Sequence, residues 1–133
     1  MSLREHLTQF IQLVEGGHSV QAIEQFYAED VVVFENHELA RAGRVKCAAY
    51  EREALALQPE PSRTRAVAMA CDETTERAFV EWLIRYKTTD GVALRLEEVL
   101  AAQSLDEVHE EATAALGQVE RLAGVIDQVA SVN

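Results

Sequence analysis

Two long segments of alternating apolar residues, joined by a tight turn, most strongly limit the folds open to this chain. In residues 77–88 the even positions from 78 to 86 are Ala, Val, Trp, Ile and Tyr, and a strand places them all on one face. Residues 92–103 alternate in the same way. Thr89-Asp90-Gly91, between the two segments, is typical of a β-hairpin turn. Together with a weaker alternation over residues 64–72, these patterns predict that the second half of the chain is an antiparallel sheet.

The first half of the chain predicts three helices and one short strand. Ser2 and Glu5 have the spacing of a capping box, and the apolar residues that follow them share one helical face. Ser19 is expected to cap a second helix. A β-branched run at residues 31–34 predicts a strand, and a third helix is expected over about residues 44–57. Helices followed by long antiparallel strands predict an α+β fold in which the helices pack on one curved sheet.

The last thirty residues follow a different pattern. From Ser104 the apolar residues recur in steps of three and four, which is the heptad seam of a helix that pairs with another helix. The residues of this seam are Leu105, Val108, Ala112, Ala115, Val119, Leu122, Ile126 and Val129. Ser104 and Glu107 form a second capping box. We therefore predict an α+β domain over residues 1–103 and a C-terminal amphipathic helix over residues 104–133. Small residues weaken the seam, so this helix could instead fold back on its own sheet.

Composition argues against several classes of partner. The 133 residues carry a formal charge of −11, which argues against nucleic acid and anionic membrane surfaces. No apolar run approaches the roughly 20 residues of a membrane-spanning helix, and the N-terminus lacks the apolar core of a signal peptide. Cys47 and Cys71 fall on different predicted elements, and neither they nor the four histidines have the spacing of metal ligands. We expect a cytoplasmic protein with reduced cysteines, no metal and no cofactor.

Five short segments carry a resemblance to a known family. They are Phe26-Tyr27-Ala28-Glu29-Asp30-Val31, Phe34-Glu35-Asn36, Gly43-Arg44, Phe79-Val80-Glu81-Trp82 and Leu96-Glu97-Glu98-Val99. With them, the stretch from Phe10 to Gln103 resembles the SnoaL-like members of the nuclear transport factor 2 superfamily. The resemblance implies a cone in which helices close one end of a strongly bent sheet around an apolar pocket. The family includes isomerases, dehydratases, cyclases, epoxide hydrolases and ligand binders, so the resemblance implies a fold rather than one activity.

The end of the chain departs from this family. Its members usually finish with a turn and a further strand, for which Asp106-Glu107 and the segment Val108–Ala114 are the candidates. Glu and Ala are better helix formers than strand formers, so we expect the helix, which would leave a sheet edge for another chain to cover. Residues 122–133 resemble the helix that approaches the hairpin tip of bacterial chemoreceptor signalling domains, although the tip sequence is absent. This second resemblance implies a sensor domain followed by the first stretch of a signalling helix.

Three residues are candidates for acid–base chemistry. Glu98 shares a strand face with leucines, where burial would raise its pKa and suit it to act as a general base or as a ligand anchor. Glu81 lies between apolar residues in the same way. Either carboxylate could instead be partly exposed or paired with an arginine. His37 follows the first predicted strand and could act as an acid or base, although a turn histidine is more often on the surface.

Aromatic side chains are candidates for the walls of a ligand pocket. Trp82 and Tyr86 lie on one face of a predicted strand, and Tyr27 and Tyr50 lie on or beside predicted helices. With Glu98 they form the predicted ligand-binding set, because aromatic walls with a few polar groups are typical of small-molecule sites. Core packing would explain the same residues equally well.

Two functions follow. In the first, the chain is a non-catalytic module that binds a small apolar ligand and forms a homodimer through its C-terminal helix, in a signalling protein. In the second, it is a small cofactor-independent isomerase, dehydratase or cyclase that uses a pocket carboxylate, Glu98 or Glu81, against Trp82 and Tyr86. The heptad seam and the absence of a convincing catalytic set favour the first.

Overall fold

The computed structural model describes residues 2–88, 90–91, 93–103 and 107–114, which form three helices and six strands. The helices are α1 (Leu3–Glu15), α2 (Ser19–Phe26) and α3 (Arg44–Ala56). The strands are β1 (Val32–Glu35), β2 (Glu38–Ala42), β3 (Arg63–Asp72), β4 (Arg77–Lys87), β5 (Ala93–Gln103) and β6 (Glu107–Ala114). None of the helices in these residues is both long and apolar enough to cross a lipid bilayer.

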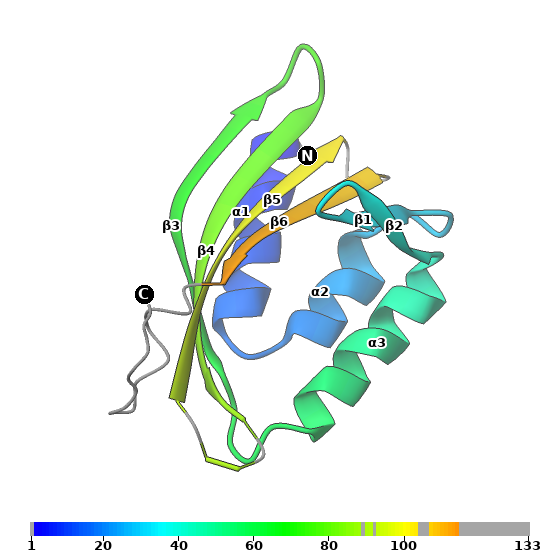
Figure 1. The fold of residues 1–133 in the computed structure, drawn as a ribbon. Helices are drawn as coiled ribbons and strands as arrows, with labels where there is room; N and C mark the ends of the chain where they lie inside the picture. The colour runs from blue at the N-terminus through cyan, green and yellow to red at the C-terminus, as the bar shows by residue number, and fades with distance from the viewer. Residues whose placement is uncertain (1, 89, 92, 104–106, 115–133) are drawn as a thin grey trace.

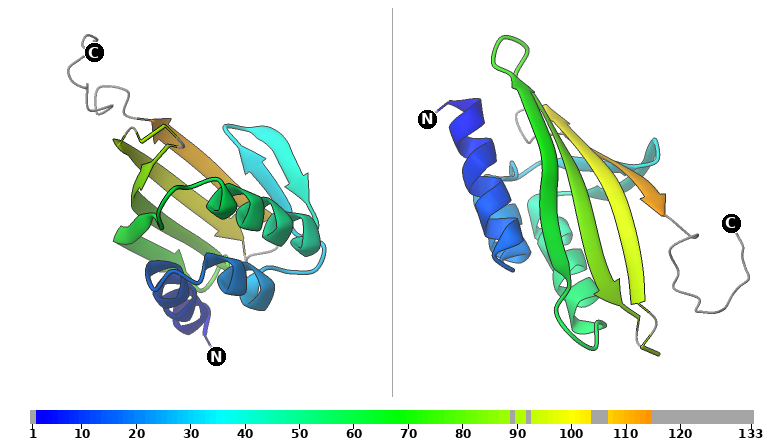
Figure 2. Two further views of the ribbon diagram at one scale, coloured as in Figure 1. Left: turned by 90° about the horizontal axis from the view of Figure 1, so that it is seen from below. Right: turned by 90° about the vertical axis from the view of Figure 1, so that its left-hand side faces the viewer.

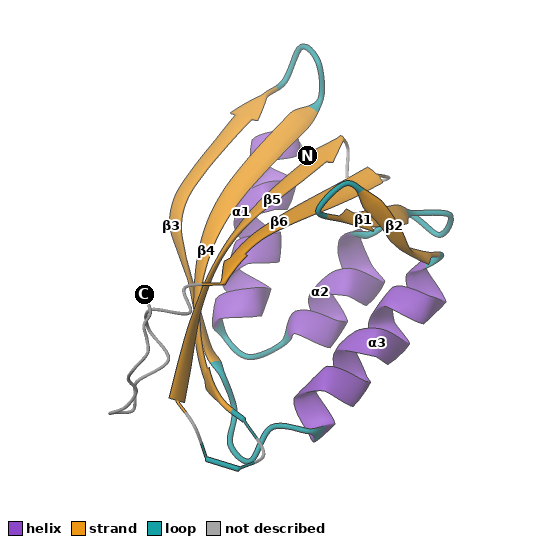
Figure 3. Ribbon diagram, in the orientation of Figure 1, coloured by secondary structure: helices purple, strands orange, loops and turns teal. Residues whose placement is uncertain are grey.

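All six strands belong to one strongly bent sheet. Their order is β2-β1-β6-β5-β4-β3, and every neighbouring pair is antiparallel except β1 and β6, which run parallel. The sheet curves around the helices, which lie on its concave side (Figures 1 and 2). This arrangement, with helices on one side and strands on the other (Figure 3), confirms the predicted α+β fold.

The first helix follows its sequence signals closely. The Ser2 hydroxyl accepts a hydrogen bond from the Glu5 N–H, and the Glu5 carboxylate accepts one from the Ser2 N–H, so the predicted capping box is present. The second helix differs from the prediction. Ser19 is its first residue rather than its cap, because His18 occupies the cap position and the Ser19 hydroxyl donates to Glu51 at 2.8 Å.

The predicted hairpin between β4 and β5 is confirmed over its full length. The two strands pair from Arg77 opposite Gln103 to Lys87 opposite Ala93. The even-numbered residues of β4 face the helices, and Val80 and Trp82 are buried among them. The period-two pattern in the sequence therefore identified both the strands and their inner face.

Residues 107–114 form strand β6, so the prediction of a helix that begins at Ser104 is wrong for this segment. Val108 is fully buried between the neighbouring strands, and the ladders of β6 to β1 and β5 replace helical hydrogen bonds. Burial and pairing on both sides outweigh the helix propensity of Glu and Ala. The sheet continues past the predicted boundary after Gln103, and β6 covers the edge that we expected to be open. The rest of the predicted helix lies outside the described residues.

The predicted strand at residues 31–34 is β1, and a second short strand that the sequence did not predict, β2, forms a hairpin with it beside β6. Strand β1 turns at Asn36 and His37, whose backbones have φ of 51° and 70°, and returns as β2. Strand β2 is mostly exposed and carries two charged residues, so its sequence lacks the apolar alternation of a strand. The hairpin matters for the site because it places Arg41 beside the sheet.

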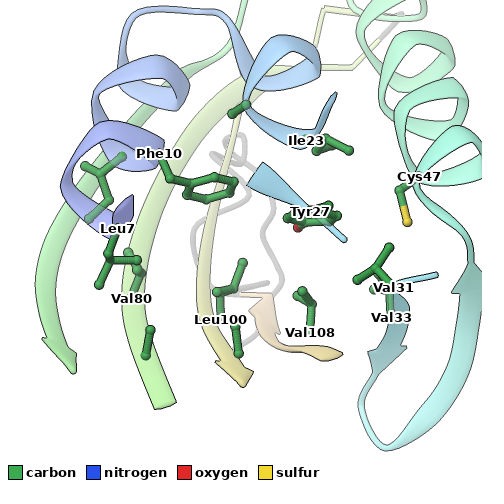
Figure 4. Packing of buried hydrophobic residues seen from close by; sticks show 14 of the residues in the cluster. Leu7, Phe10, Ile23, Tyr27, Val31, Val33, Cys47, Val80, Leu100 and Val108 are labelled. Atoms are coloured by element: carbon green, nitrogen blue, oxygen red, sulfur yellow. The ribbon is translucent and has the colours of Figure 1, made fainter. Parts of the chain in front are cut away.

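The hydrophobic core fills the space between the helices and the concave face of the sheet. Leu7, Phe10, Val33, Val80 and Val108 are among its most buried side chains. Figure 4 shows how residues from α1, α2 and the strands meet in this layer. The space between the sheet and α3 is not completely filled and contains a cavity.

Ending the chain after Gln103 should prevent cooperative folding, whereas ending it after Ala114 should preserve the fold. The shorter chain loses β6, which leaves the partners of Val108 without their packing and separates β1 from β5. Circular dichroism melting of both truncations beside the full chain checks this expectation. A cooperative transition in the chain that ends at Gln103, at an unchanged melting temperature, would contradict the placement of β6.

Candidate functional site

A cavity of about 290 Å³ opens between the concave face of the sheet and helices α2 and α3. Its apolar walls include Phe10, Ile23, Tyr27, Val33, Trp82 and Leu100. Its polar lining includes Glu35, Arg41, Cys47, Tyr50, Glu51, Glu98 and Glu110. A largely apolar cavity with a small group of convergent polar side chains is the usual form of a small-molecule site.

The strand register brings three of these carboxylates to one face of the sheet. Glu110 of β6 lies opposite Leu100 of β5 on one side and opposite Glu35 of β1 on the other. Residues that face each other across a ladder share a face, so Glu110 points into the cavity together with its neighbours. Glu98 lies two residues from Leu100 on β5 and is therefore on this same face.

Arg41 of β2 connects this group. Its Nη2 lies 2.7 Å from Oε2 of Glu35 and 3.5 Å from Oε1 of Glu110, and its guanidinium stacks 3.9 Å from the centre of the Tyr50 ring. The Arg41 side chain is only 16% exposed, so its charge is held in the protein rather than in water. Its positive charge therefore acts mainly on Glu35 in the β1–β2 hairpin and on Glu110 in β6.

Burial makes two of the carboxyl groups weak acids. Burial is the main cause that raises the pKa of Glu98 to about 7. The negative charges of Glu35 and Glu51 raise this pKa further, and the positive charge of Arg41 lowers it. Burial is also the main cause that raises the pKa of Glu110 to about 8, and the nearby charge of Glu98 adds to it. The two groups titrate as a pair, since ionising one disfavours ionising the other. Between these two values the pair therefore holds one proton.

Tyr27 presents a hydroxyl to this cavity. Its side chain is 6% exposed, and its ring stacks on Phe10 with 6.0 Å between the ring centres. The backbone is fixed at the end of α2, where the Tyr27 carbonyl accepts a hydrogen bond from Arg44. Within the described part of the chain, no side chain or backbone group bonds to the Tyr27 hydroxyl. Burial raises its pKa well above the usual value, so the phenol stays protonated and can donate.

Cys47 is the remaining reactive group in the lining. The predicted reduced state agrees with the structure, in which Cys47 and Cys71 are both free thiols. Cys47 is 3% exposed, and burial raises the pKa of its thiol, so it stays neutral at physiological pH. No group of three or more His, Cys, Asp or Glu side chains in the described residues is arranged to hold a metal ion.

The structure brings together some of the predicted site residues and separates others. Glu98, Tyr27, Tyr50 and Trp82 all line the cavity. The remaining three, which are Glu81, His37 and Tyr86, do not. Glu81 is exposed because odd-numbered residues of β4 face away from the helices, and His37 is exposed at the β1–β2 turn. Tyr86 shares the inner face with Trp82 but lies beyond the cavity, near the end of the strand.

Four charged residues of the cavity were not predicted from the sequence. They are Glu35, Arg41, Glu51 and Glu110. Glu110 falls within the segment predicted as a helix, whereas the alternative strand over residues 108–114 puts it on the same face as Val108. Glu35 ends the short β-branched strand, which is a weak signal. Arg41 and Glu51 gave no signal, because only the tertiary arrangement of β2 and α3 turns them toward β6 and β5.

The comparisons with known proteins identify the fold. No family model matches the sequence, and no curated protein matches it. Among solved structures, PrhC from Penicillium brasilianum is 14% identical with a TM-score of 0.68, and the match covers 84% of this chain and 80% of that one. A candidate polyketide cyclase from Pseudomonas putida is 16% identical with a TM-score of 0.67, over 90% and 97% of the two chains. A candidate SnoaL-like polyketide cyclase from Mesorhizobium loti is 13% identical with a TM-score of 0.61, over 85% and 99%.

The fold of this chain is therefore similar to the folds of these solved structures, one of which is described as SnoaL-like, and it agrees with the fold that the sequence resemblance implied. At these identities the likeness concerns the fold alone. The resemblance of the C-terminal segment to chemoreceptor helices finds no support, because residues 107–114 are a strand and residues 122–133 lie outside those described.

Replacing Glu98 by Gln should stabilise the protein at high pH and leave its stability unchanged at low pH. Between the ordinary carboxyl pKa of 4.5 and the folded value of about 7, the folded state binds more protons than the unfolded state, so wild-type stability falls as pH rises. We expect the free energies of unfolding of the two proteins to be equal near pH 4.5 and to differ by about 1–3 kcal/mol at pH 8.5. Urea denaturation checks this, with E81Q as the exposed control. An E98Q protein that is less stable at pH 8.5 would contradict the assignment.

Replacing Arg41 by Gln should raise the pKa of both Glu98 and Glu110 further. The guanidinium charge lowers both values, and the variant removes it while keeping an amide that can donate to Glu35. Carbon-13 NMR titration of the glutamate carboxyls measures the shift, and R65Q, which removes an exposed arginine of β3, is the control. Unchanged titration midpoints in R41Q would show that Arg41 does not act on the pair.

Proposed function

We propose that this cavity is a cofactor-independent acid–base site that transfers a proton on a small, largely apolar carbonyl compound, as in an isomerisation or a cyclisation. One observation carries the proposal: Glu98 and Glu110 face the same cavity from adjacent strands, with pKa values raised to about 7 and about 8. A base and an acid that both titrate near neutral pH are what proton transfer at carbon requires. The likeness to two candidate polyketide cyclases is consistent with this class of reaction.

The roles follow from the protonation states. The two carboxyl groups titrate as a pair near neutral pH, and in the proposed mechanism Glu98, which lies opposite Trp82 on the inner face, is the base. It removes a proton from the carbon next to a carbonyl group, and the electron pair moves to the carbonyl oxygen. Protonated Glu110 and the Tyr27 hydroxyl are donors for the resulting enolate oxygen. In a β,γ-unsaturated ketone, return of the proton from Glu98 to the γ carbon completes an isomerisation. In a dicarbonyl compound, attack of the α carbon on the second carbonyl closes a ring, and the alkoxide that forms takes the proton from Glu98.

The apolar walls support this chemistry. Trp82 and Phe10 are each 3% exposed and line the cavity beside the carboxyl groups, so they exclude water from the base. In water Glu98 would be a weak base for a carbon acid. Burial raises its basicity, and the same low polarity strengthens the hydrogen bonds to the enolate oxygen.

Ligand binding without turnover is the second candidate function, and it is the one that the sequence favoured. Its specific support is that Arg41 pairs with Glu35 and Glu110, so these three charged groups have partners before any substrate binds. The signalling role and the homodimer that we predicted depend on the C-terminal helix. Its remaining residues, 115–133, lie outside the described residues, so both stay predictions.

The proposed activity is tested by deuterium exchange of 2-tetralone, a neutral bicyclic ketone with acidic hydrogens beside its carbonyl group. We expect the wild-type protein to accelerate exchange in D2O, followed by proton NMR, and E98Q to lower the enzymatic rate by about 10²–10⁴-fold. E81Q, on the opposite face of β4, should match the wild type. Exchange at the buffer rate in wild type, with the ketone bound, would favour the ligand-binding function instead.

The pH dependence of the exchange gives a second check. The rate should rise with a pKa of about 7 as Glu98 ionises and fall with a pKa of about 8 as Glu110 loses its proton. In E110Q the falling limb should disappear, because the amide cannot lose a proton in this range. A falling limb that persists in E110Q would remove Glu110 from the proposed mechanism.

A further inference from the structure

The charged groups that line the cavity are strongly unbalanced. Among the described residues, four carboxyl groups and one guanidinium line it. The carboxyl groups belong to Glu35, Glu51, Glu98 and Glu110, and the guanidinium is that of Arg41. An anionic compound would enter a space where acidic groups outnumber basic groups, and its charge would be disfavoured there.

The single guanidinium is already engaged by other groups. Arg41 contacts Glu35 at 2.7 Å, Glu110 at 3.5 Å and the ring of Tyr50 at 3.9 Å. Two carboxyl groups remain without a basic partner in the described residues, which are those of Glu51 and Glu98. Glu51 accepts a hydrogen bond from the Ser19 hydroxyl, which fixes its position but does not neutralise its charge. Glu51 and Glu98 therefore have no positively charged partner of their own in the described part of the cavity.

The two unpaired carboxyl groups lie on different walls of the cavity. Glu51 belongs to α3 and Glu98 to β5, and the charge of Glu51 contributes to the raised pKa values of both Glu98 and Tyr27. All three side chains line this one cavity. A positive group bound in that space would be attracted by Glu51 and by Glu98.

Aromatic groups provide the second, independent indication of a ligand. The Tyr27 hydroxyl faces the cavity from a side chain that is 6% exposed, and no described group bonds to it. Figure 4 shows Phe10 and Tyr27 side by side beneath α1 and α2, and Trp82 lines the cavity near them. The faces of aromatic rings attract positively charged nitrogen, and the hydroxyl can accept a hydrogen bond from it.

We propose that the substrate of this cavity carries a positively charged nitrogen and that Glu51 is the specificity-determining residue that recognises it. The inference rests on the proposed function, since it names the class of carbonyl compound on which Glu98 and Glu110 act: an amino ketone or a related amine. Glu51 holds the ammonium group at the helical wall, which leaves the carbonyl end of the compound toward the sheet.

Recognition of an ammonium group is coupled to the protons of the cavity. The ionisable groups that line the cavity with Glu98 come from four elements and from the residue that follows α2. They are Tyr27 after α2, Glu35 on β1, Arg41 on β2, Cys47, Tyr50 and Glu51 on α3, and Glu110 on β6. The described lining from α1, β3 and β4 is uncharged. A cation held between Glu51 and Glu98 favours the ionised form of Glu98, which is the form that the proposed base requires. Binding should therefore release a proton and become tighter as pH rises through about 7.

Three bicyclic probes of one shape test the inference. They are 2-aminotetralin, a cation at neutral pH, the neutral 2-tetralone, and the anion tetralin-2-carboxylate. By isothermal titration calorimetry with the full chain at pH 7.5, we expect the amine to bind about tenfold more tightly than the ketone and the carboxylate to bind most weakly. Amine binding should tighten between pH 6 and pH 8.5, and ketone binding should not.

Two variants of α3 separate the role of Glu51 from a general effect of charge. E51Q keeps an acceptor for Ser19 and removes the negative charge, and we expect it to weaken amine binding about tenfold with ketone binding unchanged. E53Q removes a neighbouring exposed carboxylate outside the cavity and should bind all three probes as the wild type does. Melting curves of both variants verify that they are folded.

Equal affinity for the three probes, tighter binding of the carboxylate, or an E51Q protein that binds the amine as wild type does would each overturn the inference. These failures are distinct from failure of the proposed function. If Glu98 is needed for the exchange of 2-tetralone but the protein does not prefer the amine, only the proposed substrate class is overturned. If the protein prefers the amine through Glu51 but does not exchange 2-tetralone, recognition of the cation is supported and the catalytic proposal is overturned.

Discussion

The parallel pairing of β1 with β6 is the interaction on which the rest of the structure depends. It sets Val33 beside Val108 on the inner face, and both side chains are almost completely buried. The same register sets Glu35 beside Glu110, two residues further along both strands. The pairing therefore joins the hairpin of β1 and β2 to the long strands and completes both the core and the polar end of the cavity. Without it, Arg41 would have no carboxylate of β6 to contact.

The cavity combines features that a stable core avoids. Carboxyl groups are rarely buried unless a basic group neutralises them, because removing a charge from water is unfavourable. Here the guanidinium of Arg41 is shared between Glu35 and Glu110, while Glu98 is buried beside the apolar walls and has no basic partner in the described residues. Burial raises the pKa of Glu98 and of Glu110 to near neutrality, so protonation of these two carboxyl groups lowers the penalty. Local departures from good packing of this kind are most often found where a protein binds or transforms a ligand.

Sequence signals were most informative where the interactions are local. The capping box of Ser2 and Glu5 and the alternation of β4 involve residues that are near neighbours in the chain, so the pattern and the structure agree. Residues 107–114 are the opposite case. Their Glu and Ala content favours a helix locally, but two neighbouring strands and the burial of Val108 determine a strand. Glu98 was found because its leucine neighbours mark the inner face, and Glu110 was missed because its segment was assigned to the wrong element.

The amino-acid sequence by itself determined the helices, the long hairpin, the α+β class and the inner face that carries Trp82 and Glu98, because periodicity and caps act over a few residues. Tertiary structure alone decided which charged groups meet. Arg41 and Glu110 are 69 positions apart in the chain, and Ser19 and Glu51 are 32 apart. Contacts at such separations depend on strand register and helix packing, which are set by the whole core. The composition of the cavity, and with it the chemistry that we propose, is a property of the fold rather than of any local pattern.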